Sequence, residues 1–397
     1  MPSSARTPAP VHWLPADSPD KPPSPGIALC LSGGGYRAML FHLGATWRLN
    51  ELGYLKRLAR VSSVSGGSIT AGVLARNWNT LEFGADAKAP PSQFESQIVH
   101  PIRALASATI DVWSIAKGAL PWHKVSDAVA DYYRSYLFGA ATLQDLPDNP
   151  RFVINSTNVQ SGVLWRFSKP YMADWRVGMI RKPAVSLAFA VAASSAFPPF
   201  LSPAYLDLQK ERFEPGSGYD LQKPPFTTQA VLTDGGVYDN LGLETAWKNY
   251  ITVLASDGGM ALAPEEHPSS TWPLHIYRVL NVINNQVGSL RKRELIRSYE
   301  LPAENPLART GTYWGIGSDI DSYPIPNAPS YVFNSETCPP VRTRALAATR
   351  TRLESLTERV QEQIINWGYA ICDIAMRTHV DAALPAASGF PYPRSAV

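Results

Sequence analysis

Residues 26–37 of the chain read Gly26-Ile-Ala-Leu-Cys-Leu-Ser-Gly-Gly-Gly-Tyr-Arg37. The short apolar run at 26–32 is typical of a strand buried inside a parallel sheet, and three glycines stop it. Apolar residues then recur at helical spacing from Tyr36 to Leu52, and Gly53 follows as a stop signal. This stretch therefore predicts a buried strand, a glycine-rich turn and a helix.

The same pattern repeats directly downstream. Residues 60–64 are a second strand candidate, and residues 66–78 again have helical character. Strands that alternate with helices at such short spacing favour a parallel sheet with helices on its faces. Further strands are expected at 152–157, 163–167, 230–233 and 251–256, and further helices at 183–193, 272–299 and 342–376.

The 397 residues contain no internal repeat and indicate one α/β unit with helical additions. Residues 1–25 are dominated by Pro, Ser and Ala, and we expect them to form a flexible N-terminal tail. Residues 26–397 are expected to form a single domain, with its core motifs at 26–260 and a helical extension at 270–380.

The composition excludes several classes of protein. Hydrophobic residues make up 45% and charged residues 17%, which is globular rather than disordered. A net charge of +3 gives no nucleic-acid footprint. Cys30, Cys338 and Cys372 match no metal spacing, so we expect no metal, no cofactor and no disulfide framework. No signal-peptide pattern is visible, and no apolar run approaches the ~20 residues that span a bilayer, so no transmembrane segment is predicted.

A serine nucleophile is predicted at Ser65, in Ser63-Val-Ser-Gly-Gly67. A strand-to-helix elbow lifts a serine hydroxyl out of the fold, and the residues two before and two after it must be small. Ser63 and Gly67 meet this condition, although Ser63 departs from the usual Gly-x-Ser-x-Gly pattern. The N–H of Gly66 would point to where negative charge develops on an acyl oxygen. The alternative is an ordinary loop-to-helix turn with an N-cap serine.

The glycine run at residues 33–35 suits either a phosphate cradle or an oxyanion hole, because it exposes backbone N–H groups. A dinucleotide site requires an acidic residue about 20 positions later, at the end of the second strand. That strand ends in Val61-Ser-Ser-Val-Ser65 without a carboxylate. The oxyanion hole is therefore favoured, and nucleotide binding stays the weaker alternative. Arg37 either stabilises this loop or meets a phosphate headgroup.

The base for Ser65 is expected at Asp234, which follows an apolar strand and precedes Gly235 and Gly236. A carboxylate beside a serine can act as the base in a water-poor site. None of the seven histidines lies in a short motif after a strand. Asp257 is also followed by two glycines, and these local patterns do not choose between the two aspartates.

Taken together, the motifs resemble the patatin-like phospholipase family, and the chain looks like a bacterial member of it. Members share a glycine-rich loop after the first strand, a Gly-x-Ser-x-Gly elbow and a downstream Asp-Gly-Gly or Asp-Gly-Ala motif. The chain has all three in this order, at residues 33–37, 63–67 and 234–236. Residues 191–199 also resemble the Ala-Ser-x-Ala-x-Pro segment of the family.

The resemblance implies an α/β three-layer sandwich with a central, mostly parallel sheet and helical C-terminal additions. It also implies a serine lipid-acyl hydrolase that cleaves carboxyl esters of phospholipids or related lipids through an acyl-serine intermediate. Its Ser–Asp dyad would be Ser65 and Asp234, and Asp257 would be a second strand-end turn. The oxyanion-hole residues would be Gly33, Gly34, Gly35 and Gly66. The motif-supporting residues would be Arg37, Ser63, Gly67, Gly235 and Gly236. The alternative is a catalytically silent lipid-binding or regulatory protein with the same fold.

The expected partner is a lipid or membrane-surface substrate, met from the aqueous side. Residues 105–138 are rich in aromatic and aliphatic side chains and suit a cap over the site, although core packing explains them equally well. Residues 291–293 and Arg297 form a basic face that could touch anionic headgroups, but most such runs are solvated surface. We expect a cytoplasmic location with peripheral membrane contact, and export by a non-classical route stays open.

Overall fold

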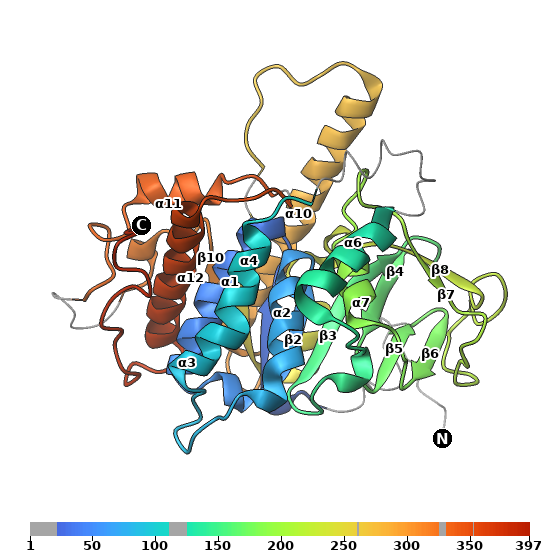
Figure 1. The fold of residues 1–397 in the computed structure, drawn as a ribbon, viewed down its shortest axis with the longest axis horizontal. Helices are drawn as coiled ribbons and strands as arrows, with labels where there is room; N and C mark the ends of the chain where they lie inside the picture. Colours follow the sequence, from blue (N-terminus) through green and yellow to red (C-terminus); the bar gives the residue numbers. More distant parts are fainter. Residues whose placement is uncertain (1–21, 111–124, 260–261, 325–330, 352) are drawn as a thin grey trace.

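A mixed sheet of ten strands lies between two layers of helices (Figure 1). The computed structural model describes residues 22–110, 125–259, 262–324, 331–351 and 353–397. The strands are β1 (Ser24–Leu31), β2 (Leu58–Val64), β3 (Arg151–Asn158), β4 (Val163–Phe167), β5 (Tyr171–Asp174), β6 (Gly178–Arg181), β7 (Ala204–Asp207), β8 (Gln229–Asp234), β9 (Tyr250–Asp257) and β10 (Thr310–Gly315).

The α-helices of the described residues are α1 (Gly35–Glu51), α2 (Gly66–Asn77), α3 (Pro91–Phe94), α4 (His100–Ala106), α6 (Val125–Tyr133), α7 (Leu187–Ser194), α8 (Gly236–Asp239), α9 (Glu244–Trp247), α10 (Trp272–Glu300), α11 (Pro340–Ala347) and α12 (Glu358–His379). Short π-helical turns at Glu95–Val99 and Arg134–Phe138 extend α3 and α6. Single 3-10 turns occur at Leu55–Arg57, Trp78–Thr80, Leu143–Asp145 and Ile320–Ser322.

The parallel part of the sheet has the strand order β10-β9-β1-β2-β3. Helices cover both of its faces, which explains why β1 and β9 read as continuous apolar runs rather than alternating ones. β4, β5 and β6 extend this part antiparallel, and β8 pairs antiparallel with β3 and with β7. The predicted helix-flanked α/β sheet is confirmed. In its antiparallel half, β4 and β8 were expected as strands, whereas their antiparallel orientation and the strands β5, β6 and β7 were not indicated by the sequence patterns.

The C-terminal helix α12 packs directly against α1. Two glycines permit this close approach, because a Cβ atom on Gly44 would lie 1.9 Å from the Ile365 carbonyl oxygen and one on Gly368 would lie 2.0 Å from that of Phe41. A buried ion pair between Arg48 Nε and Asp373 Oδ1, 2.6 Å long, joins the same two helices. The predicted helical extension therefore supports the helix that follows the glycine run.

Three element boundaries differ from the sequence prediction. The expected helix at 342–376 is two helices, α11 and α12, separated by residues 348–357. The expected helix at 183–193 begins only at Leu187, because the Ser186 hydroxyl caps α7 by accepting the Phe189 N–H. β1 begins at Ser24, inside the expected tail, and residues 1–21 lie outside the described residues.

The three cysteines are free and buried. Within the described ranges, no helix combines the length and apolar character needed to cross a membrane. α10 differs from the other long helices, because its first half projects from the body of the molecule (Figure 1).

Candidate active site

The ends of β2 and β8 meet on one side of β3. β2 runs parallel to β3 and ends at Val64, which lies opposite Asn155. β8 runs antiparallel to β3 and ends at Asp234, which lies opposite the next residue, Ser156. β4 occupies the other side of β3 here, so β2 and β8 approach each other end to end. This register brings the residue after β2, Ser65, to the carboxylate at the end of β8.

Ser65 has the backbone of a nucleophile elbow. Its φ of 51° and ψ of −121° are strained for a residue with a side chain, and α2 begins directly after it. The turn leaves no room at Gly66, where a Cβ atom would lie 2.1 Å from the Gly35 carbonyl oxygen. The Gly67 N–H donates to the Ser32 carbonyl, 3.1 Å away, and so ties the elbow to the glycine run.

A buried network of serine hydroxyls stabilises the elbow. Ser194 Oγ accepts the Ser65 N–H at 2.9 Å and donates to the Asn155 carbonyl at 2.6 Å. Ser68 Oγ lies 3.0 Å from Ser63 Oγ and 2.9 Å from Ser194 Oγ. The Ser63 hydroxyl is therefore accommodated, which explains how the chain departs from glycine at this position. The role of Ser194 was not recognised in the sequence, although it lies in the segment that resembles the family.

Replacing Ser194 with alanine is expected to lower kcat about 10–100-fold on a soluble ester, because the Ser65 backbone loses its anchor. It should also lower the free energy of unfolding by about 1–3 kcal/mol, since the buried Ser65 N–H loses its hydrogen-bond acceptor. Urea unfolding and steady-state kinetics measure the two effects. Ser186→Ala is the matched control, because it removes the cap of the same helix without touching Ser65. Equal kcat values for the two variants would contradict the anchoring role.

The glycine run offers two backbone donors, not three. The Gly33 N–H donates to the Asn240 carbonyl, 3.0 Å away, so the expectation that Gly33 supplies an oxyanion donor is wrong. In the described part of the chain, the N–H groups of Gly34, Gly35 and Gly66 form no such bond. Gly34 and Gly35 have positive φ values of 144° and 58°. α1 and α2 begin at Gly35 and Gly66, so two positive helix ends converge beside Ser65.

Arg37 stabilises the glycine loop. Its guanidinium is buried and donates to the carbonyls of Gly258, Ala347 and Thr349 at 2.8–3.1 Å. Burial lowers the pKa of Arg37 to about 10. Of the two roles that the sequence left open, contact with a phosphate headgroup is excluded, because these carbonyls occupy the side chain.

His42 is a structural residue. Its Nε2–H donates to the Ser32 carbonyl at 2.9 Å, and its Nδ1 accepts from Ser256 Oγ at 2.8 Å in the tautomer that satisfies both bonds. Burial lowers the pKa of His42 to about 4, so the ring is neutral at ordinary pH. Its two nitrogens are occupied, and it is not a free base.

Asp234 and Asp257 form the same local turn but differ in the hydrogen bonding of one carboxylate oxygen. Oδ1 of Asp234 accepts the Gly236 N–H at 2.7 Å, and Oδ1 of Asp257 accepts the Gly259 N–H at 2.8 Å. Oδ2 of Asp257 accepts the hydroxyl of Tyr313 at 2.7 Å. Oδ2 of Asp234 is buried and has no hydrogen-bond partner of normal geometry among the described residues. A buried carboxylate oxygen without a partner requires an explanation, and a catalytic role is one such explanation.

Burial raises the pKa of Asp234 to about 6, although the Gly236 N–H and the nearby Ser65 hydroxyl both favour its charged form. A carboxylate with this pKa is a stronger base than a solvated one and is still mostly ionised at neutral pH. The Gly235 N–H donates to the Ser194 carbonyl at 3.2 Å, so the Asp234 turn is fixed to the same segment as the Ser65 elbow.

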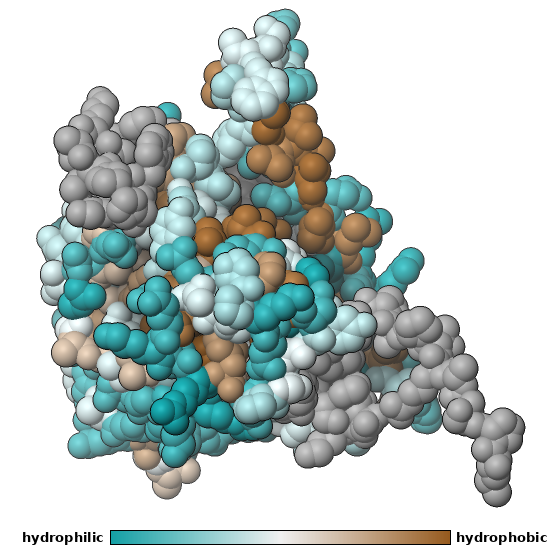
Figure 2. Space-filling model, turned by 90° about the vertical axis from the view of Figure 1, so that its right-hand side faces the viewer, coloured by the Kyte–Doolittle hydropathy of each residue, from teal (hydrophilic) through white to brown (hydrophobic). Residues whose placement is uncertain are grey.

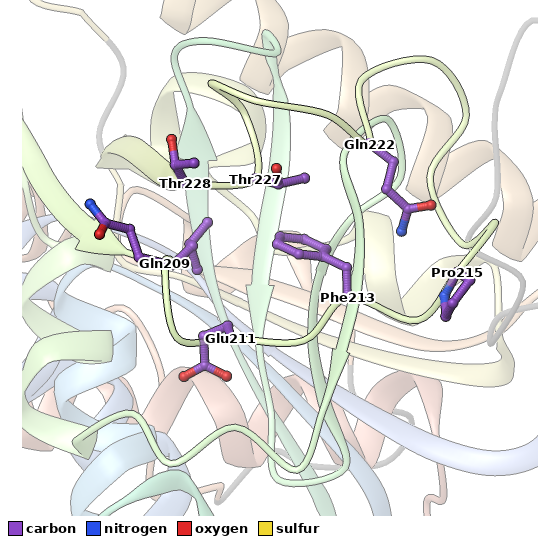
Figure 3. A pocket seen from close by; sticks show the side chains of 8 residues that line it. Gln209, Glu211, Phe213, Pro215, Gln222, Thr227 and Thr228 are labelled. Carbon is purple, nitrogen blue, oxygen red and sulfur yellow. The ribbon is translucent and has the colours of Figure 1, made fainter.

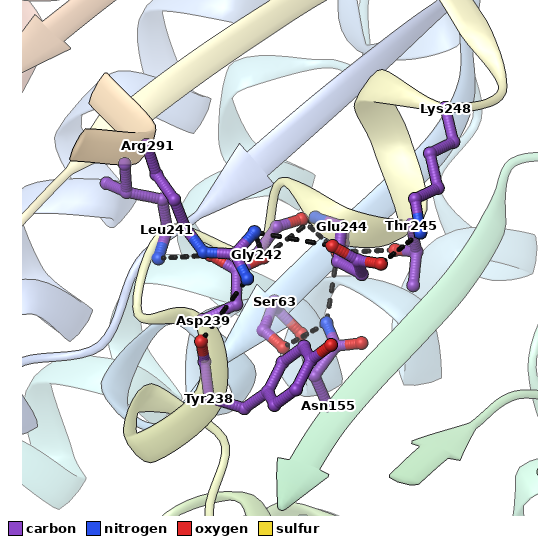
Figure 4. A network of polar contacts seen from close by, with 11 residues as sticks. Ser63, Asn155, Tyr238, Asp239, Leu241, Gly242, Glu244, Thr245, Lys248 and Arg291 are labelled. Carbon is purple, nitrogen blue, oxygen red and sulfur yellow. Dashed lines mark hydrogen bonds and ion pairs between the residues drawn. The ribbon is translucent and has the colours of Figure 1, made fainter. Parts of the chain in front are cut away.

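A polar network holds the loop that follows Asp234 (Figure 4). Asp239 accepts the N–H groups of Leu241 at 3.2 Å and Glu244 at 2.7 Å, and so caps the short helix α9. Asn155 Nδ2 donates to the Ser63 carbonyl at 2.9 Å. Arg291 of α10 joins the network through Glu244, 3.3 Å away. The loop after Asp234 is thereby connected to β2, β3 and α10.

A cavity of about 500 Å³ lies elsewhere, among the loops at 208–228 (Figure 3). Glu211 is its single ionisable lining residue, and neither Ser65 nor Asp234 borders it. In the described residues no group of three or more His, Cys, Asp or Glu side chains could hold a metal ion. The chemistry-bearing groups therefore gather at the ends of β2 and β8.

The cap predicted at 105–138 falls partly on residues 111–124, which lie outside the described residues. Of the rest, Ile110, Tyr133, Leu137 and Phe138 are buried in the main hydrophobic core, whereas Tyr136 is exposed. The described part of this segment therefore mostly packs in the core.

Comparison with known proteins gives a family and a fold. The sequence profile of the patatin-like phospholipase family matches residues 29–247. No curated protein sequence gives a significant match. The structure is similar to that of human GIVD cytosolic phospholipase A2, with a TM-score of 0.51 and 13% identity, over 87% of this chain and 60% of that chain. At this identity the likeness shows the fold alone.

Two further solved structures are similar to a lesser degree. The same human protein in complex with methyl gamma-linolenyl fluorophosphonate and terbium chloride gives a TM-score of 0.49 and 16% identity, over 88% of this chain and 57% of that chain. VipD from Legionella pneumophila gives 0.35 and 16%, over 88% of this chain and 66% of that chain. The chain thus spans less than two thirds of the length of each of these proteins.

Proposed function

The chain belongs to the patatin-like phospholipase family, and from this premise we propose that it is a serine lipid-acyl hydrolase with a Ser65–Asp234 dyad. One observation carries the proposal: the unpartnered, buried Oδ2 of Asp234 at the end of β8, where β8 meets the strained Ser65 at the end of β2. The substrate class, carboxyl esters of phospholipids or related lipids, follows from the family.

The proposed reaction has two halves. Ser65 Oγ attacks the ester carbonyl while Asp234 takes its proton, and the N–H groups of Gly34, Gly35 and Gly66 stabilise the oxyanion. The tetrahedral intermediate collapses to an acyl-serine, and the proton on Asp234 passes to the leaving alcohol. Water then attacks the acyl-serine, Asp234 accepts its proton, and the fatty acid leaves as the proton returns to Ser65. No histidine takes part.

The direct test is a panel of lipid esters, with released fatty acid measured for the purified chain. Hydrolysis of at least one member is expected. A folded protein that hydrolyses no ester and does not react with a fluorophosphonate would favour the alternative, a silent lipid-binding or regulatory protein with this fold.

The rate of hydrolysis is expected to depend on one group with a pKa of about 6. Asp234 must be ionised to accept the proton, and burial raises its pKa to about 6. kcat/KM should therefore be flat at neutral pH and fall about tenfold per unit below this pKa. An uncharged soluble ester should be followed from pH 4.5 to 8. If the fall of kcat/KM at acid pH disappeared in a folded variant with one histidine replaced, that histidine would be the base, and the dyad would be contradicted.

A further inference from the structure

The projecting half of α10 exposes many large apolar side chains. We call residues 272–290 the α10 arm. Trp272 is 75% exposed and Leu274 is 60% exposed, and seven further large hydrophobic residues from Ile276 to Leu290 are exposed by a third or more. Figure 2 shows apolar surface running along this projecting part. Exposure of such a large apolar surface to water is unfavourable, which indicates that the surface binds a partner.

Exposed apolar side chains leave the arm in several directions, with polar side chains between them. The polar residues are His275, Arg278, Asn281, Asn284, Asn285, Gln286 and Ser289. An α-helix turns about 100° per residue, so Leu274, Leu280 and Val282 leave its axis in three directions that lie about 80–160° apart. A protein partner, including a second copy of the chain, covers one stripe of a helix. A helix with this mixture suits the surface of a bilayer, where apolar side chains meet acyl chains and polar side chains meet headgroups and water. The arm projects from the body, which favours lipid.

The distribution of charge fits the surface of a bilayer. Arg278 is the one charged residue between 269 and 290. It is neutralised by Glu265, 3.4 Å away, and donates to the Ala263 carbonyl at 2.7 Å. Residues 291–300 follow where the arm ends and carry four basic and two acidic side chains, a net charge of +2. Arg293 and Arg297 are exposed and form no ion pair within the described residues, whereas Arg291 is held by Glu244. When the arm points into a bilayer, its apolar side chains reach the acyl chains, and the basic residues at its base lie at the level of the phosphate headgroups.

The arm stands on the side of the molecule where the dyad lies. β9 runs parallel to β1 and β2 and ends at Asp257, at the edge where the glycine run and Ser65 follow their strands. The chain passes from this edge to the start of α10. The base of α10 contacts α8, the turn after Asp234, where Arg291 Nη2 donates to the Tyr238 carbonyl at 3.4 Å. Contact of the arm with a surface therefore turns the edge that carries Ser65 toward that surface.

We propose that the α10 arm inserts into the surface of a phospholipid bilayer and delivers the Ser65–Asp234 site to its substrate. The delivery step rests on the proposed function, whereas the binding step does not. The arm does not cross the bilayer, since no described helix is apolar enough to do so. The basic residues after the arm predict tighter binding when the bilayer contains anionic lipid.

The test compares two triple variants of the whole chain. The arm variant carries Trp272→Ser, Leu274→Ser and Ile283→Ser, and the control carries Val159→Ser, Leu307→Ser and Val341→Ser. All six residues are more than half exposed, and the control residues lie off the arm. Binding is measured by sedimentation with phosphatidylcholine vesicles that contain phosphatidylglycerol. The arm variant should bind at least about tenfold more weakly than the control variant, because three inserted side chains are lost.

Catalysis separates this inference from the proposed function. The arm variant should hydrolyse lipid in vesicles at least about tenfold more slowly and a short-chain soluble ester at the normal rate. If the wild type hydrolyses no ester but binds vesicles through the arm, the docking surface stands and the proposed function fails. Equal vesicle binding by the two variants, or no binding by the wild type, overturns the docking surface. Arm-dependent dimerisation in sedimentation velocity, without an effect on vesicle binding, would assign the arm to a second copy and also overturns it.

Discussion

Ser65→Ala is expected to lower kcat/KM for every ester substrate by about 10⁴-fold or more. The hydroxyl is the only group proposed to form the covalent bond, and loss of such a nucleophile removes both halves of the reaction. A fluorophosphonate should label the wild type on the peptide that contains Ser65 and leave the variant unlabelled. Mass spectrometry and steady-state kinetics measure the two effects.

The matched control is Ser63→Gly, two residues away in the same elbow. It restores the common Gly-x-Ser-x-Gly pattern and removes one hydroxyl of the buried serine network. We expect it to keep its label and most of its activity, at some cost in stability. Equal thermal unfolding of Ser65→Ala and the wild type shows that the fold is intact. Labelling of folded Ser65→Ala at the wild-type rate would remove Ser65 from the mechanism.

The features that were predicted correctly from the sequence depend on neighbouring residues. The apolar run before the glycines predicts β1, and helical spacing after them predicts α1. Ser65 could be selected as a candidate because an elbow requires small residues on both sides, which is a local condition. Its backbone has the elbow conformation, and its catalytic role stays a prediction. The break between α11 and α12 also had a local sign that was overlooked, since the Thr357 hydroxyl caps α12 by accepting the Val360 N–H.

The features that were missed depend on residues far apart in the sequence. Gly33 was expected to be a donor, and the carbonyl that occupies its N–H belongs to Asn240. Arg37 is fixed by Ala347 and Thr349, which no spacing rule connects to it. The antiparallel strands β5, β6 and β7 have four residues each, too few to show a period.

The choice between Asp234 and Asp257 shows the same limit most clearly. Both residues end a buried strand and precede two glycines, and both bond to the second glycine in the same way. Tyr313 satisfies the second oxygen of Asp257 from the neighbouring strand β10. Among the described residues, the second oxygen of Asp234 has no hydrogen-bond partner of normal geometry, and it lies at the strand end that faces Ser65. The same substitution at the two aspartates therefore compares a candidate base with a structural turn residue.

Asp234→Asn is expected to lower kcat by about 10³-fold or more, because an amide cannot accept the Ser65 proton. Asp257→Asn, its matched control, should keep kcat within about tenfold of the wild type. Kinetics on a soluble ester measure both. If Asp257→Asn caused the larger loss of kcat in a folded protein, the assignment of the base would be reversed.

Asp234→Asn is also expected to change how the stability of the protein depends on pH. Burial raises the pKa of Asp234 to about 6, above the value of about 3.9 for aspartate in an unfolded chain. The folded state therefore binds the proton more tightly, and the wild type loses stability as the pH rises from about 4 to about 6. Asparagine removes this ionisation, so Asp234→Asn should be more stable than the wild type at pH 8, by about 1–3 kcal/mol. The difference between the two should vanish near pH 4. Urea unfolding at both pH values measures it, and a variant less stable than the wild type at pH 8 would show that the ionised carboxylate stabilises the fold.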